Sequence, residues 1–186
     1  MTEQEKVVYD LVLFDLDGTL SDSSDLIAIS LQFDYKFATG KEPISIQQIK
    51  DELISGNLYD ELCQMIGRKI DQEEYNKILE AHIQYQEKMI YEHLRIYDGA
   101  LPLLNKLKQL NIKMGIITNR DQPSLDQHLK FLKIFDFFDL IVPMSQTERH
   151  KPYPDPIFYA MKELKITDPK RVLFVGDAQT DIQSGL

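Results

Sequence analysis

Four short runs of consecutive apolar residues lie along the chain, one near its start and three in its second half. None of these runs alternates with polar residues, which is typical of strands that are covered on both faces, as in a parallel sheet between helices. The pattern therefore predicts four central strands: Leu11–Phe14, Met114–Ile117, Leu140–Val142 and Val172–Val175.

Helical patterns alternate with the last three of these strands. Leucines recur at helical spacing in residues 101–110 and again in residues 125–134. Asp155 followed by Pro156 resembles an N-cap and a first helical residue, and predicts a helix that continues to about Leu164. Strand alternating with helix indicates an α/β fold with a doubly wound, Rossmann-like parallel sheet.

Residues 21–97 break this alternation, because they contain several helix signals and no convincing strand. Ser45–Gln48 and Asp71–Glu74 both resemble capping boxes, in which side chains satisfy the free backbone amides of a helix start. A long helix is expected after the second box, with apolar residues near helical spacing at Tyr75, Ile78, Leu79, Ile83 and Ile90. We therefore predict an all-helical module, 21–97, inserted into an α/β core made of residues 1–20 and 98–186.

Composition narrows the class of protein. The chain has 186 residues and a formal net charge of −9 at pH 7, which argues against a nucleic-acid partner. Its one cysteine, Cys63, allows no internal disulfide, so the cytoplasm is the expected location. No run approaches the roughly 20 apolar residues of a membrane span, and the N-terminus lacks the layout of a signal peptide. The sequence leaves the oligomeric state open.

Polar side chains follow each predicted strand. They are Asp15 and Asp17 after the first strand, Thr118 and Asn119 after the second, Lys151 after the third, and Asp177 and Asp181 after the fourth. Ligands of open α/β sheets bind beyond the carboxyl ends of the strands, so we expect these side chains to converge. Several carboxylates at one place cost free energy unless a cation lies among them. Ligation by oxygen alone suits Mg²⁺.

The stretches FDLDGTL, IITN, KPYPDP and GDAQTD resemble, in order and spacing, the four motifs of the haloacid dehalogenase superfamily of phosphohydrolases. The resemblance covers nearly the whole chain. The helical insert resembles the C1 cap of that superfamily, of the kind found in phosphoglycolate phosphatases and β-phosphoglucomutase. The resemblance implies a Mg²⁺-dependent phosphatase that acts on a small phosphomonoester, with phosphoglycolate as one candidate.

The resemblance also implies a role for each motif residue. Asp15 would attack phosphorus and form an aspartyl phosphate. Asp17 would protonate the leaving oxygen, later take a proton from water, and reach the metal through its backbone carbonyl. Thr118 and Lys151 would bind the phosphate and complete the catalytic set, with Asn119 close by. The metal site would be formed by Asp15, Asp17, Asp177 and Asp181.

Other functions remain open at this point. A phosphomutase of the β-phosphoglucomutase type would use the same core, and nothing in the sequence separates it from a phosphatase. A dehalogenase fits less well, since Asp17 supplies an acid that phosphoester cleavage needs. A signalling receiver module would carry its phosphorylated aspartate in mid-chain, where this chain has Thr118. Superfamily members usually continue past the last motif through a helix and at least one more strand, whereas this sequence ends at Leu186. An inactive binding protein with an incomplete core is therefore a further alternative.

Several residues lie outside these motifs. Cys63 is expected in the core, and Arg120 could face either substrate or solvent. The segment Gly56–Tyr59 is a candidate substrate-facing loop, although an ordinary connection between helices explains it better. The histidines show no metal-ligand spacing and are expected on helices or at the surface: His82, His93, His128 and His150.

Overall fold

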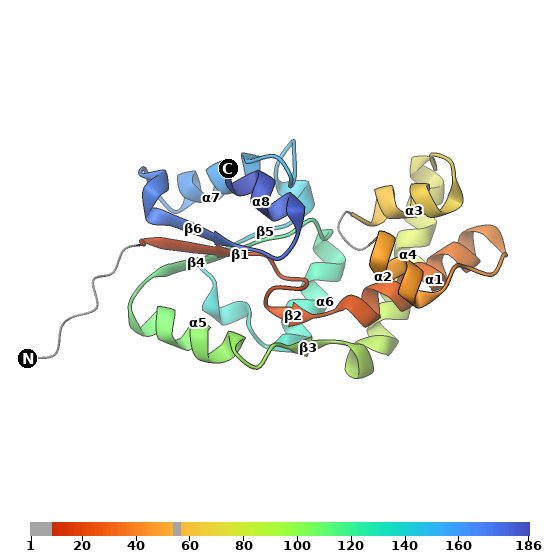
Figure 1. Cartoon of the computed structure of the whole chain (residues 1–186), viewed down its shortest axis with the longest axis horizontal. Helices are drawn as coiled ribbons and strands as arrows, with labels where there is room; N and C mark the ends of the chain where they lie inside the picture. The colour runs from red at the N-terminus through yellow and green to blue at the C-terminus, as the bar shows by residue number, and fades with distance from the viewer. Residues whose placement is uncertain (1–8, 54–56) are drawn as a thin grey trace, which may run out of the picture.

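The computed structural model describes residues 9–53 and 57–186. These residues form a sheet with helices on both faces and, beside it, a group of four packed helices (Figure 1). Gly56 of the candidate loop lies outside the described residues.

The central sheet has four parallel strands in the order β5-β4-β1-β6. Their bounds are β1 (Leu11–Phe14), β4 (Lys113–Ile117), β5 (Leu140–Val142) and β6 (Val172–Val175). The chain adds β4 and β5 on one side of β1 and then crosses over to place β6 on the other side. The four predicted strands are confirmed, and the strand order reverses between β1 and β6.

Helices cover both faces of this sheet (Figure 1). On one face, Val12 and Phe14 of β1 belong to the same apolar cluster as residues of α5 (Ala100–Gln109) and α6 (Gln122–Leu132). On the opposite face, Leu11 and Leu13 pack with residues of α7 (Asp155–Glu163). The absence of alternation in the apolar runs therefore follows from burial on both faces. The covering helices are α5 (Ala100–Gln109), α6 (Gln122–Leu132), α7 (Asp155–Glu163) and α8 (Gln179–Gly185). Short 3₁₀ turns join the strands and helices at Phe135–Phe137, Met144–Gln146 and Pro169–Arg171.

Two helix starts differ from the prediction. α6 begins before residue 125, because the Asp121 side chain accepts a hydrogen bond from the Ser124 backbone N–H and caps the helix there. Asp155 is not the cap of α7 but its first residue, and Pro154 holds the N-cap position. The Asp155 carboxylate accepts a hydrogen bond from Arg149 Nε at 3.0 Å instead of capping the backbone.

The predicted helices of the insert are present and pack around a core of their own. Ala28, Leu31, Ile49, Leu62 and Ile78 form its buried centre, and each of the four helices contributes to it. The helices are α1 (Ser24–Thr39), α2 (Ile46–Glu52), α3 (Leu58–Ile66) and α4 (Gln72–His93). In the part of the chain that the structure describes, no helix is long and apolar enough to span a bilayer.

The two expected capping boxes have different outcomes. Ser45 and Gln48 form the reciprocal pair at the start of α2, as predicted. Asp71 caps α4 by accepting from the Glu74 backbone N–H at 2.8 Å. The Glu74 side chain does not complete the capping box with the Asp71 backbone, because Arg68 donates to both of its carboxylate oxygens, at 2.7 and 2.8 Å.

The expectation of no strand in residues 21–97 was wrong. β2 (Ser21–Asp22) and β3 (Arg95–Ile96) form an antiparallel pair in which Ser21 lies opposite Ile96. Strands of two residues are too short to leave a pattern in the sequence. The pair lies where the chain enters and leaves the group of four helices α1–α4, which we call the cap. The predicted boundaries between core and cap, at 20/21 and 97/98, stay a prediction.

Candidate active site

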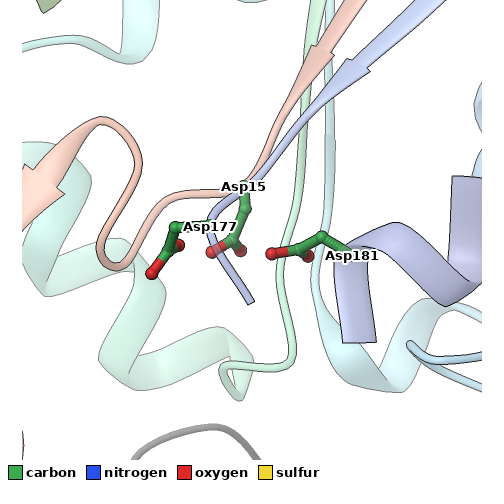
Figure 2. A group of neighbouring side chains, drawn as sticks. All are labelled: Asp15, Asp177 and Asp181. Atoms are coloured by element: carbon green, nitrogen blue, oxygen red, sulfur yellow. The ribbon is translucent and has the colours of Figure 1, made fainter. Parts of the chain in front are cut away.

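Three carboxylates meet at the carboxyl ends of β1 and β6, beside the reversal of strand order (Figure 2). Asp15 directly follows β1, Asp177 lies in the turn after β6, and Asp181 lies on α8. One oxygen atom from each lies within 4.8 Å of the other two. The structure therefore brings together three of the four residues that the sequence assigned to a metal.

Lys151 lies between two of these carboxylates. Its Nζ is 2.6 Å from Asp15 Oδ1 and 2.6 Å from Asp181 Oδ1, and all three side chains are buried. Burial raises the pKa of Asp15 to about 7, although the ammonium of Lys151 acts in the opposite direction. Burial also disfavours the charged lysine, but the two carboxylates outweigh this and raise the pKa of Lys151. A positive charge is thus held against Asp15 at neutral pH.

Two glycines allow the carboxylates to come this close. Gly18 has a φ of +81°, and a Cβ at this position would lie 2.3 Å from Asp177 Oδ2. A Cβ at Gly176 would lie 2.3 Å from the Asp181 side chain. Thr19 Oγ1 donates a hydrogen bond to Asp177 Oδ1 at 2.9 Å and orients that carboxylate. A cluster of carboxylate oxygens without nitrogen or sulfur donors fits Mg²⁺.

Gly18→Ala is expected to weaken Mg²⁺ binding by tenfold or more, because the new Cβ would displace the Asp177 carboxylate. Gly67→Ala is the matched control, since Gly67 also has a positive φ (+78°) but no atom within 4 Å of the added Cβ. In both variants alanine must adopt a left-handed backbone conformation, which lowers the free energy of unfolding by about 1–2 kcal/mol. Calorimetric titration of the folded variants with Mg²⁺ measures metal affinity separately from this loss of stability. Equal affinities in the two variants would contradict a metal site at Asp177.

Asp17 lies apart from the carboxylate cluster. Its Oδ2 and Oδ1 accept hydrogen bonds from Arg120 Nε and Nη2 at 3.0 and 2.8 Å, and Oδ1 also accepts from Ser23 Oγ at 2.6 Å. Burial opposes the charge on Asp17, but the guanidinium of Arg120 outweighs burial and holds the pKa of Asp17 well below its usual range. The predicted roles of Asp17 toward metal and leaving group stay predictions.

Arg120, whose surroundings the sequence left open, joins the core to the cap. Besides binding Asp17, its Nη1 donates to Ser124 Oγ at 2.5 Å and to Gln86 Oε1 of α4 at 3.4 Å. His128 Nε2 lies 3.2 Å from the same Gln86 oxygen. Burial, followed by the nearby Arg120, lowers the pKa of His128 to about 3, so this imidazole is neutral. A buried polar network therefore links Asp17 to α4.

Thr118 and Asn119 lie at the end of β4, between the cluster and the Arg120 network. Thr118 is buried, and its Oγ1 accepts a hydrogen bond from the Arg120 backbone N–H at 3.2 Å. Its hydroxyl proton is therefore directed elsewhere. Asn119 Nδ2 donates to the Lys151 carbonyl at 2.9 Å and so fixes the loop that carries this lysine.

A pocket of about 280 Å³ opens over these residues and reaches into the cap. Its core side includes Asp15, Thr118, Lys151 and Asp177, and its cap side is formed by α1, α3 and α4. Asn57 and Leu58, from the candidate loop, are among the lining residues, so this part of the loop does face the pocket.

No functional signal in the sequence pointed to the histidines, two of which are buried near the pocket. His82 lines the pocket, and His128 lies with its Nδ1 4.0 Å from Asp17 Oδ1. Both lie on helices, as expected, but neither is at the surface. The helical spacing of polar residues along the buried face of α4, at His82 and Gln86, could have indicated His82. Cys63 is half-buried beside the core of the cap.

Comparison with known proteins agrees with this geometry. A family described as haloacid dehalogenase-like hydrolase matches residues 12–186. N-acetylmuramic acid 6-phosphate phosphatase of Pseudomonas aeruginosa is 31% identical over 175 residues, which cover 94% of this chain and 76% of that protein. Pyrophosphatase PpaX of Bacillus cereus is 31% identical over 180 residues, covering 94% and 77%. A solved structure, described as a predicted phosphoglycolate phosphatase from Haemophilus somnus, has the same fold, with a TM-score of 0.81 at 24% identity over 97% of this chain and 82% of that one. The chain therefore belongs to the family of haloacid dehalogenase-like hydrolases.

Proposed function

We propose that this hydrolase is a Mg²⁺-dependent phosphatase that cleaves a small phosphomonoester through an aspartyl phosphate on Asp15. The observation that carries the proposal is the buried Asp15 carboxylate, held 2.6 Å from Lys151 Nζ in a pocket that is also lined by Asp177. The phosphatases among its relatives support the same reaction class.

Asp15 is arranged to act as the nucleophile. Lys151 binds its Oδ1, whereas Oδ2 has no hydrogen-bond partner among residues 9–53 and 57–186. Oδ2 would form a bond to phosphorus while the bond from phosphorus to the leaving oxygen breaks. Water would then attack phosphorus, release phosphate and restore the Asp15 carboxylate.

The phosphoryl group would be bound by Thr118 and Lys151. Because Thr118 Oγ1 already accepts from a backbone N–H, its hydroxyl can donate to a phosphoryl oxygen. The ammonium of Lys151 would offset negative charge on Asp15 and on the phosphoryl oxygens. Asn119 would act by holding the Lys151 loop in place.

Asp17 would give a proton to the leaving oxygen and later take one from water. In the present arrangement its carboxylate is bound by Arg120 and Ser23. The carboxylate must leave these partners before it can take up the proton that the leaving group needs. Asp17 therefore has two positions in the proposed cycle, of which the structure describes one.

Mg²⁺ would be held by Asp15 and Asp177, with Asp181 and the Asp17 backbone carbonyl close to it, and would offset phosphoryl charge in the transition state. The direct test is release of inorganic phosphate from a panel of phosphomonoesters, with Mg²⁺ and with EDTA. We expect release that requires the metal. Metal-independent release, or none from folded protein, would contradict the proposal, and transfer to a sugar hydroxyl with glucose 1-phosphate would indicate a mutase.

Mg²⁺ binding is expected to tighten about tenfold between pH 6 and pH 8. The carboxyl group of Asp15 must lose its proton to bind a cation, and its pKa is raised to about 7 by burial. The acid form therefore predominates at pH 6 and the carboxylate at pH 8. Titration calorimetry at both pH values measures the change, and Asp15→Asn should remove it. An unchanged affinity in the wild-type protein would show that Asp15 is not a ligand.

A further inference from the structure

We propose that the leaving group of the substrate is an uncharged alcohol with further hydroxyl or amide groups, bound by the polar face of α4, and that His82 is the main specificity-determining contact. The inference rests on the proposed phosphatase function of this pocket. It narrows the substrate to esters of neutral polyols and sugars.

The basic side chains that line the pocket already have acidic partners. Lys151 is held between two carboxylates of the cluster, and Arg120 is bound by Asp17. In the described part of the chain, no other lysine or arginine lines the pocket. The sequence of residues 54–56 is Ile-Ser-Gly, which adds no charge. A carboxylate or second phosphate on the leaving group would thus reach a cation only by competing with Asp17 for Arg120, and would otherwise lose water without gaining one.

The cap instead presents side chains with hydrogen-bonding groups along one face of α4. Tyr75, His82 and Gln86 all line the pocket, and their spacing of seven and four residues places them on the same side of the helix. Burial, followed by nearby carboxylates, raises the pKa of Tyr75, so its hydroxyl stays protonated. Gln86 Nε2 has no hydrogen-bond partner among the residues that the structure describes. These groups exchange hydrogen bonds with hydroxyls and amides.

His82 is held rigidly for such a contact. Its Nδ1 lies 2.6 Å from Oδ2 of Asp34, which is completely buried on α1. The carboxylate fixes the orientation of the imidazole ring, as in other carboxylate–histidine pairs. The remaining ring nitrogen, Nε2, has no hydrogen-bond partner within residues 9–53 and 57–186, while the side chain lines the pocket. Nε2 is therefore the atom that a substrate hydroxyl would meet.

Apart from Ser24, Asn57 and Glu61, the remaining cap wall is apolar, and the space is small. Ile27 and Leu31 of α1 lie one helical turn apart, and Leu58 begins α3. The volume of about 280 Å³ is near the lower limit for ligand pockets. Carbon atoms of a short polyol or a single sugar would contact these side chains while its hydroxyls face α4.

The wild-type enzyme provides the first test. We would measure kcat/KM for glycerol 3-phosphate and glucose 6-phosphate, for pyrophosphate and 2-phosphoglycolate, and for p-nitrophenyl phosphate as a general substrate. A neutral ester is expected to exceed both anionic substrates by about tenfold or more. Hydrolysis of p-nitrophenyl phosphate with preference for an anionic substrate would overturn the inference and leave the phosphatase function intact. Failure with every substrate would remove the proposed function as well.

Two pairs of variants test the residues. His82→Asn is expected to raise KM for the preferred neutral ester about tenfold with a smaller change in kcat, whereas Lys77→Gln, on the exposed side of α4, should change neither. Leu58→Arg adds a cation to the pocket and should shift preference toward pyrophosphate and 2-phosphoglycolate relative to Leu58→Gln. This second pair does not depend on the buried Asp34 contact, so it decides the question even if His82→Asn fails to fold. Equal preference in the two Leu58 variants would count against the inference.

Discussion

Asp15→Asn is expected to reduce Mg²⁺-dependent phosphate release by about 10⁴-fold or more, because it removes the carboxylate that would attack phosphorus in the proposed mechanism. The amide has nearly the shape of the carboxylate, and Asp15 ionises against the cost of burial, so folding should not suffer. Initial rates of phosphate release, measured beside circular dichroism spectra, give the result. Trapping of radiolabelled phosphate on the wild-type protein, and none on the variant, would identify the intermediate.

Asp126→Asn is the matched control for this variant, since Asp126 is exposed on α6 and contacts Gln122 only at the surface. Its rate should equal that of the wild-type protein. If Asp15→Asn retained more than about a hundredth of the activity, another nucleophile would have to act, and the proposed chemistry would be wrong.

Lys151→Met is expected to lower both stability and activity. The change leaves Asp15 and Asp181 buried without their shared cation, which should cost about 3 kcal/mol or more in the free energy of unfolding. Loss of the ammonium that would bind the phosphoryl group in the proposed mechanism should reduce kcat about 10²- to 10³-fold. Urea denaturation without metal, together with phosphate release at saturating Mg²⁺, measures the two effects separately.

The stability deficit of Lys151→Met should depend on pH. Asp15 already has a raised pKa, so its ionisation destabilises the folded chain as pH rises from the ordinary value of a carboxyl toward about 7. Without Lys151 this penalty grows, so the deficit should be larger at pH 8 than at pH 5. Lys162→Met, on the exposed side of α7, should be neutral at both pH values. A deficit independent of pH would mean that lost packing, and not charge, causes it.

The central sheet could be predicted from the sequence because its strands are buried on both faces. Leu11–Phe14 is apolar at every position, and each side chain has a helix to pack against. The same runs indicated where the polar residues would meet, since parallel strands end at one edge. Asp15 and Asp177 thus lie together although they are far apart in sequence.

Other contacts could not be predicted, because they join distant residues of types that occur everywhere. Arg120 and Asp17 are 103 positions apart, and no local pattern favours their pairing over solvation. His82 and Asp34 are 48 positions apart on two cap helices. The orientation of Asp17 depends on such contacts, whereas the position of Asp15 depends on the end of a strand.

The pairing of β2 with β3 has a consequence for how substrate preference can change over evolutionary time. Ser21 lies opposite Ile96, so the chain leaves the core and returns to it at neighbouring points. The entropic cost of closing a loop between two such points grows only slowly with the length of the loop. The sheet can therefore accept inserts of different size and sequence at this junction without rearranging Asp15 or Lys151. Replacing the helices between β2 and β3 as a cassette from a relative should transfer substrate choice while the core side of the pocket stays unchanged.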